Sequence, residues 1–166
     1  LFDAIICRLV LMYLPDPAAV LRAQAAVLRP NGLVVPIEFD IPTARALPPT
    51  PLLERVSSWI HQAFTRAGAA TSLEARLWSV LTDAGLRPAG MVGVQPHFGP
   101  EDPDGVRLLS GVVRALLPVI ERTGVATAAE VDIDTLPQRL RDSLAASASV
   151  FAFPMLLSAW AFKVKT

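Results

Sequence analysis

The sequence has few of the residues that build disulfides or metal centres. Cys7 is its one cysteine, so it forms no internal disulfide and offers no cysteine-based zinc site. Its two histidines, His61 and His97, lie 36 positions apart in the chain, and neither has a cysteine nearby. We therefore expect no metal site, and the cysteine usage favours a reducing, cytoplasmic setting.

An excess of charge and a long hydrophobic run are also missing. Lys and Arg total 15, Asp and Glu total 15, and the formal net charge is zero, so bulk charge does not attract nucleic acid or an anionic membrane. The chain is 52% hydrophobic with a mean hydropathy of +0.45. Its apolar stretches Ala4–Leu14 and Val150–Phe162 are nevertheless shorter than the roughly 20 residues of a spanning helix. We expect no nucleic-acid partner and no membrane span.

Several glycine and catalytic motifs are absent as well. None of the nine glycines lies two positions from another, and no glycine precedes a lysine, so the chain contains neither a G-x-G dinucleotide loop nor a P-loop. It also contains no G-x-S-x-G nucleophile elbow and no H-E-x-x-H zinc motif. These absences disfavour a hydrolase or a metalloenzyme and leave no phosphate-binding loop within these residues.

The first forty residues predict a strand, a helix and a second strand. Ala4–Val10 is a nearly continuous apolar run, which is typical of a strand buried on both faces of a parallel sheet. Asp16 and Pro17 form a capped helix start, and the apolar spacing continues the helix to about Arg29. Pro30–Gly32 ends it, and Leu33–Phe39 is the next strand. This βαβ unit indicates an α/β fold.

The rest of the chain is richer in helices. The segment 41–51 contains four prolines and predicts a loop, and Thr71–Glu74 has the pattern of a capping box. Two further strands are expected at Met91–Gln95 and in the apolar tail Phe151–Val164. Helices are expected at Leu52–Ala67, Leu73–Ala84, Val106–Arg122 and Ala128–Ala145, the last two interrupted by Pro118 and Pro137.

The order of these elements carries a resemblance to a known family. Phe2-Asp3 opens an apolar strand, Leu14-Pro15-Asp16-Pro17 precedes the helix, and Leu28-Arg29-Pro30-Asn31-Gly32 turns into the next strand. This order resembles the C-terminal half of class I S-adenosylmethionine-dependent methyltransferases, closely over residues 2–40 and more loosely over 71–95. Asn31 replaces the usual first glycine of the turn, and asparagine also tolerates the left-handed conformation.

The resemblance implies a partial Rossmann-like sheet. The family's sheet has the order 3-2-1-4-5-7-6, and this chain supplies strands 4, 5, 6 and 7. Its start at Leu1, at the edge of an apolar run, leads us to expect that residues 1–166 are the C-terminal part of one methyltransferase domain. The Gly-rich cofactor half is then absent. The segments 41–70 and 96–149 are expected to form helical lid insertions.

The same resemblance assigns candidate site residues. The backbone of Cys7, Arg8 and Leu9, at the end of the first strand, is expected to lie against the methionyl part of S-adenosylmethionine. Arg8 interrupts an apolar run, so it needs a route to solvent or a carboxylate partner, either Glu38 or one in the absent half of the domain. Candidate proton acceptors are Glu38, Asp40, His61 and His97, although each also suits a structural role.

Two functions from different classes remain open on these residues. The first is methyl transfer from S-adenosylmethionine to a small, hydrophobic acceptor with S-adenosylhomocysteine as product, the fragment alone being inactive. The second is a non-catalytic α/β association module whose open edge is completed by a partner chain. A homo-oligomer is compatible with either function.

Overall fold

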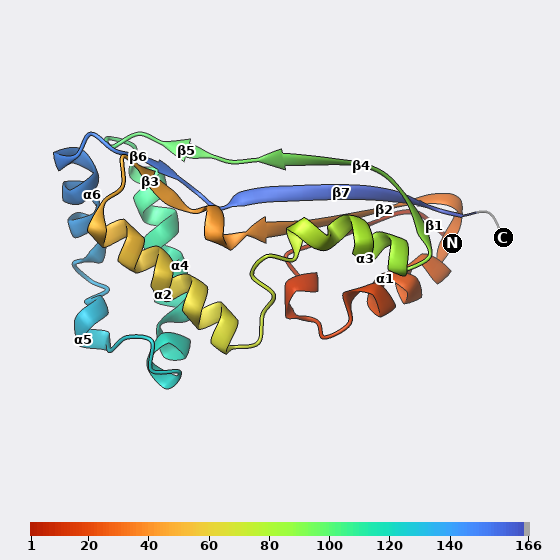
Figure 1. Cartoon of the computed structure of the whole chain (residues 1–166), viewed down its shortest axis with the longest axis horizontal. Coiled ribbons are helices and arrows are strands. Elements are labelled where there is room, and N and C mark those ends of the chain that lie inside the picture. Colours follow the sequence, from red (N-terminus) through yellow and green to blue (C-terminus); the bar gives the residue numbers. More distant parts are fainter. Residues whose placement is uncertain (165–166) are drawn as a thin grey trace. The chain divides into compact units, whose positions relative to one another are not determined.

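The computed structural model describes residues 1–164, apart from the side chain of Glu74, and divides into two compact units. The first unit comprises residues 1–40, 70–94 and those from 155 onward, and the second comprises residues 41–69 and 95–154. Each unit contains its own sheet and its own helices (Figure 1). The α/β prediction is confirmed, and the two expected insertions together make up most of the second unit.

The first unit is built on a four-stranded mixed sheet. Its strands follow the order β1 (Phe2–Arg8), β2 (Leu28–Asp40), β7 (Met155–Lys163) and β4 (Leu86–Val94). β1 is parallel to β2, whereas β7 is antiparallel to both β2 and β4. This is the arrangement 4-5-7-6 that the resemblance implies, and it is confirmed for these four strands.

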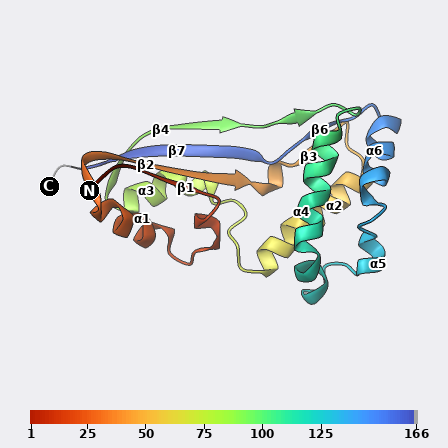
Figure 2. The same ribbon diagram turned by 180° about the vertical axis from the view of Figure 1, so that it is seen from behind.

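Two helices of the first unit, α1 (Pro17–Ala26) and α3 (Leu77–Asp83), pack against the sheet and against each other, on the same face in both views (Figures 1 and 2). The side chain of Asp16 accepts a hydrogen bond from the amide of Ala19 at 2.9 Å, so the predicted helix cap is present. Leu21 and Leu81 are fully buried.

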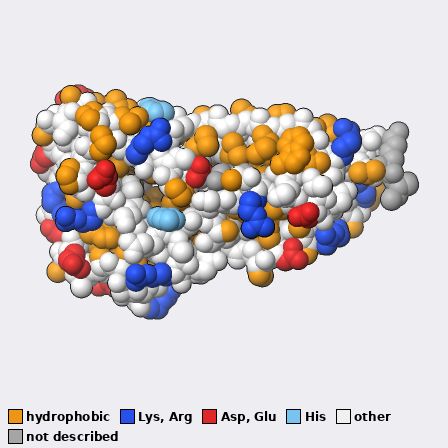
Figure 3. All heavy atoms as spheres, in the orientation of Figure 1, with side chains coloured by type: hydrophobic (Ala, Val, Ile, Leu, Met, Phe, Trp, Pro, Cys, Tyr) orange, Lys and Arg blue, Asp and Glu red, His pale blue; other side chains and the backbone are white. Residues whose placement is uncertain are grey.

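The first strand is more exposed than its sequence predicts. Of β1, Cys7 is buried, whereas the side chain of Ile6 is 70% exposed and that of Phe2 is 63% exposed. Two facts explain the difference: β1 is an edge strand, and α1 and α3 cover one face of the sheet. Hydrophobic side chains also gather at the surface over β4 and β7 (Figure 3). The prediction of a strand buried on both faces is wrong for the described residues.

The second unit combines helices with a small antiparallel sheet. Its principal helices are α2 (Pro51–Arg66), α4 (Pro103–Arg122) and α6 (Leu136–Ala146), and its sheet has the order β3 (Arg45–Leu47), β6 (Val150–Ala152) and β5 (His97–Phe98). Phe98, Phe151 and Phe153 form an aromatic cluster with ring centroids 5.9 to 6.4 Å apart. The expected insertions are therefore not purely helical.

Several predicted boundaries change because of local backbone geometry. The expected tail strand is divided into β6 and β7 by Phe153 and Pro154. The expected helix over 128–145 is divided into α5 (Ala128–Val131) and α6, because Asp132 adopts a left-handed φ of 43°. Pro137 lies in the first turn of α6, a position that tolerates proline. Pro118 lies inside α4 without ending it.

Other boundaries differ around the predicted loop and capping box. The segment 41–51 contains the 3-10 turn η2 (Ile41–Thr43) and β3 instead of being wholly irregular. α3 begins at Leu77, after the 3-10 turn η3 (Glu74–Arg76), so the predicted start at position 73 is wrong. The Glu74 side chain of the expected capping box lies outside the described residues.

Within residues 1–164, every helix is too short or too polar to cross a membrane.

We expect Gly90→Ala to destabilise the first unit. A Cβ atom at Gly90 meets the ring of Trp160, its neighbour on β7, at 2.1 Å, so the ring must move to accept it. Overpacking of this kind costs about 1 to 3 kcal/mol, measured as the free energy of urea unfolding. Gly99→Ala is the control, because its Cβ meets nothing within 4 Å. Equal stability of the two variants contradicts this packing.

Candidate functional site

The candidate site in the first unit lies where β1 and β2 end. These strands are parallel, and Arg8 of β1 pairs with Ile37 of β2, so their carboxyl ends share one edge of the sheet. Ligands of open α/β sheets bind at this edge. The structure brings five of the seven predicted site residues to it: Cys7, Arg8, Leu9, Glu38 and Asp40.

The chain turns sharply at Leu9, directly after β1. Leu9 has a left-handed φ of 55°, and its amide donates to the carbonyl oxygen of Ile37 at 2.8 Å. A non-glycine residue in this region costs about 1 to 2 kcal/mol, so the surrounding structure must hold it there. The 3-10 turn η1 (Leu11–Tyr13) follows immediately. We name residues 9–13 the β1 turn.

A buried carboxylate holds the β1 turn. The side chain of Glu38, which is fully buried, accepts hydrogen bonds from the amides of Val10 and Leu11 through Oε1, at 3.1 and 2.8 Å. Its Oε2 atom is buried without a hydrogen-bond partner. Charged hydrogen bonds contribute about 1.5 to 3 kcal/mol each, so Glu38 is the main polar tether between β2 and the turn.

Burial dominates the electrostatics of this edge. Burial raises the pKa of Glu38, and the backbone amides of the β1 turn oppose part of that rise. Burial, together with the charge of Glu38, also raises the pKa of Cys7 and of Tyr13. The pKa of Asp40 is raised by burial as well. Carboxylates with a raised pKa are stronger bases than surface carboxylates, which fits proton transfer at this edge.

Arg8 reaches solvent instead of pairing with Glu38. Its side chain is exposed at the end of β1, whereas the Glu38 carboxylate accepts its hydrogen bonds from backbone amides of the β1 turn. Of the explanations that the sequence leaves open for this charge, a route to solvent is the one observed among the described residues. The proposed Arg8–Glu38 ion pair is wrong for the described residues.

The two histidines lie in the second unit. His61 is half-buried on α2, where its backbone carbonyl accepts a hydrogen bond from the hydroxyl of Thr65 at 2.9 Å. His97 is exposed on β5, with Nδ1 3.0 Å from the carbonyl oxygen of Gln95. They therefore belong to a different unit from Glu38 and Asp40, and their role as bases stays a prediction. Among residues 1–164, no group of three or more His, Cys, Asp and Glu side chains is arranged to hold a metal ion.

Sequence reasoning missed the amides of Val10 and Leu11. Backbone donors leave no mark in the identity of a residue, so no motif identifies them. The one available signal was Glu38 itself, an acidic residue at a position where the alternation of β2 points inward. That position predicts a buried carboxylate, and a buried carboxylate requires donors.

Comparison with known proteins supports the resemblance over the same segment. Residues 1–35 match the family model described as a methyltransferase domain. This segment covers β1, the β1 turn, α1 and the first part of β2. The predicted resemblance is therefore confirmed for the segment that carries its motifs. A search of curated proteins gives no significant match.

Solved structures give a weaker likeness. The chain is similar to a candidate methyltransferase of Bacillus halodurans (14% identity, TM-score 0.49), to the YcgJ protein of Bacillus subtilis (16%, 0.46) and to a Haemonchus contortus phosphoethanolamine N-methyltransferase (11%, 0.47). Each match covers 99% of this chain but only 65%, 65% and 34% of the other chain, respectively. The chain thus spans less than two thirds of these proteins. With TM-scores below 0.5, these likenesses establish no activity.

We expect Glu38 to make the stability of the first unit depend on pH. Because burial raises its pKa, the folded protein holds this proton at pH values where the unfolded chain has lost it. The resulting stability is present at low pH and is lost as the pH rises from about 4 through the raised pKa. Urea unfolding at several pH values therefore shows the advantage of the wild type over Glu38→Gln shrinking as the pH rises. Asp40 is present in both proteins, so its own titration cancels in this comparison. If the free energies of unfolding of the two proteins change in parallel with pH, the assignment to Glu38 is contradicted.

Proposed function

We propose that the protein containing this chain transfers a methyl group from S-adenosylmethionine to a small, hydrophobic acceptor. The observation that carries the proposal is the methyltransferase-domain match over residues 1–35, which contain β1, the β1 turn and α1. The sheet to which β1 belongs has the expected strand order. The chain would be the C-terminal part of the enzyme, in a cytoplasmic setting compatible with its buried free thiol at Cys7.

The residues at the end of β1 fit the expected cofactor. The β1 turn is tethered by Glu38 and by the Leu9 amide, so its backbone offers a rigid surface to a ligand. The orphaned Oε2 of Glu38 is an acceptor suited to a cationic neighbourhood. We assign Cys7, Arg8 and Leu9 to binding the methionyl part. S-adenosylmethionine supplies the electrophilic methyl group when it is bound.

The chain's own residues then orient the reactants and move a proton. Methyl transfer requires a positioned acceptor and a water-poor site more than a side-chain nucleophile. Asp40, with a pKa raised by burial, is a candidate proton acceptor in the first unit. His61 and His97 are candidates in the second unit, which we assign to recognition of the acceptor. Glu38 is a positioning residue, because its contacts are with the chain's own amides.

Calorimetric titration of the full-length protein with S-adenosylhomocysteine tests the proposal. We expect saturable binding that Glu38→Ala weakens by about tenfold or more, since the amides of Val10 and Leu11 lose their acceptor. Glu38→Gln is the matched control, because its amide oxygen keeps those two hydrogen bonds and most of the affinity. Absence of binding to the folded wild type, or equal binding by all three proteins, contradicts the assignment.

One observation favours the second candidate, an association module. In the described residues, no strand pairs with the outer edge of β1, and Leu1 and Phe2 beside that edge are exposed. Such an edge is a template for another chain. Sedimentation of the isolated 166-residue chain distinguishes the two candidates. We expect concentration-dependent association without a defined stoichiometry, whereas a discrete symmetric dimer without cofactor affinity supports the module and contradicts the enzyme.

A further inference from the structure

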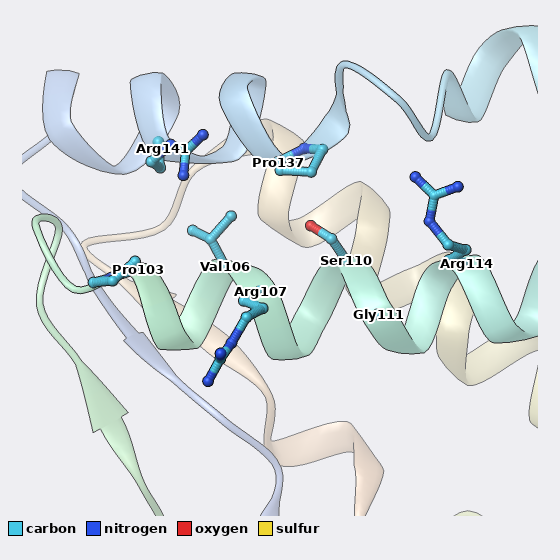
Figure 4. A pocket seen from close by; sticks show the side chains of 8 residues that line it. All are labelled: Pro103, Val106, Arg107, Ser110, Gly111, Arg114, Pro137 and Arg141. Atoms are coloured by element: carbon cyan, nitrogen blue, oxygen red, sulfur yellow. The ribbon is translucent and has the colours of Figure 1, made fainter.

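A groove between α4 and α6 of the second unit is not used by the function above. Its volume is about 360 Å³, within the range of small-molecule sites. Every residue that lines it belongs to one of these two helices (Figure 4). The groove therefore lies wholly within one compact unit.

A buried hydroxyl without a partner lies in this groove. Ser110 of α4 is 7% exposed, and its Oγ atom is buried with no hydrogen-bond partner. In Figure 4 its hydroxyl points toward α6, on the side of Pro137. An unsatisfied buried hydroxyl costs about 1 to 3 kcal/mol, so a hydrogen-bonding ligand in the groove would remove that cost.

The charged side chains that line the groove are all positive. Arg107 forms an ion pair with Asp104 at 3.0 Å, and Arg114 forms one with Asp134 at 3.0 Å. Arg141 of α6 instead donates to the neutral side-chain oxygen of Gln138 at 3.0 Å. The guanidinium group of Arg141 thus remains the cation best placed to bind an added anion.

The rest of the lining is apolar or open. Val106, which is 2% exposed, points from α4 toward α6, and Pro103 and Pro137 contribute further apolar surface. Gly111 lies next to Ser110, and a Cβ atom built there meets nothing within 4 Å. A glycine inside a helix costs stability relative to alanine. At position 111, the missing side chain leaves open space in the groove.

We propose that this groove binds a small carboxylate that carries a short apolar chain. Arg141 binds the carboxylate, since the planar guanidinium fork matches carboxylate geometry. The hydroxyl of Ser110 donates to the ligand, and Val106 and Pro137 contact the apolar chain. The proposal does not rest on methyl transfer, because every contributing residue belongs to the second unit.

Titration of the isotope-labelled full-length protein with sodium hexanoate, followed by amide NMR, tests the proposal. We expect saturable shifts confined to residues around 106–111 and 137–141, and none with 1-hexanol, which has the same chain but no charge. Arg141→Gln weakens hexanoate binding by about tenfold, because it removes a charge-assisted hydrogen bond. Arg122→Gln, at the end of α4 and outside the groove, leaves binding unchanged.

Filling the groove gives a second, independent readout. Gly111→Leu places a side chain in the open space while improving helix propensity, so the protein stays folded and binding is lost. Gly111→Ala fills less of the space and retains part of the affinity. Equal binding of hexanoate and 1-hexanol, unchanged binding in Arg141→Gln or Gly111→Leu, or no saturable binding to the wild type overturns the proposal. S-adenosylhomocysteine binding is measured in a separate experiment, so failure of the hexanoate proposal is distinguished from failure of the proposed methyl transfer.

Discussion

The buried carboxylate of Glu38 is the interaction on which the first unit's functional edge depends. It lies at the end of β2 and accepts the amides of Val10 and Leu11, which follow the end of β1. A carboxylate is costly to bury, and its Oε2 atom lacks a partner, so a hydrophobic residue would suit simple packing better. The tether holds the two residues that directly follow the left-handed Leu9. The conformation of the turn and the ionisation of Glu38 are therefore coupled.

Much of the first unit could be predicted because its signals are local. The capped start of α1 follows from residue types with strong backbone preferences. The left-handed backbone of Asn31, with a φ of 62°, also suits its residue type, but the helix that Asn31 was expected to end stops at Ala26, and Asn31 lies within β2. The strand order came from the family resemblance, because pairing between distant strands has no local signature. The exposure of Ile6 on β1 was not predictable from an apolar run, which does not distinguish an edge strand from a central strand.

The second unit was predicted less well, because pairing between strands that are distant in sequence leaves no local signature. Its small sheet pairs β6 with β3 and β5, which are distant in sequence and only two or three residues long. The aromatic packing of Phe98 on Phe151 accompanies that pairing, and helical periodicity says nothing of it. Among the candidate site residues, the position of Glu38 and Asp40 at the end of β2 was predictable from the strand pattern, and strand ends are where ligands of open α/β sheets bind. The placement of His61 and His97 in another unit depends on tertiary contacts.

Photolabelling of the full-length protein with methyl-labelled S-adenosylmethionine, followed by trypsin digestion, tests the central claim most directly. Cleavage after Arg8 and Arg22 isolates the peptide Leu9–Arg22, which contains the β1 turn and no internal Lys or Arg. The account predicts label on this peptide, lost when excess S-adenosylhomocysteine is present. Label that is absent from this peptide, or that persists there with excess S-adenosylhomocysteine, would contradict cofactor binding at the end of β1.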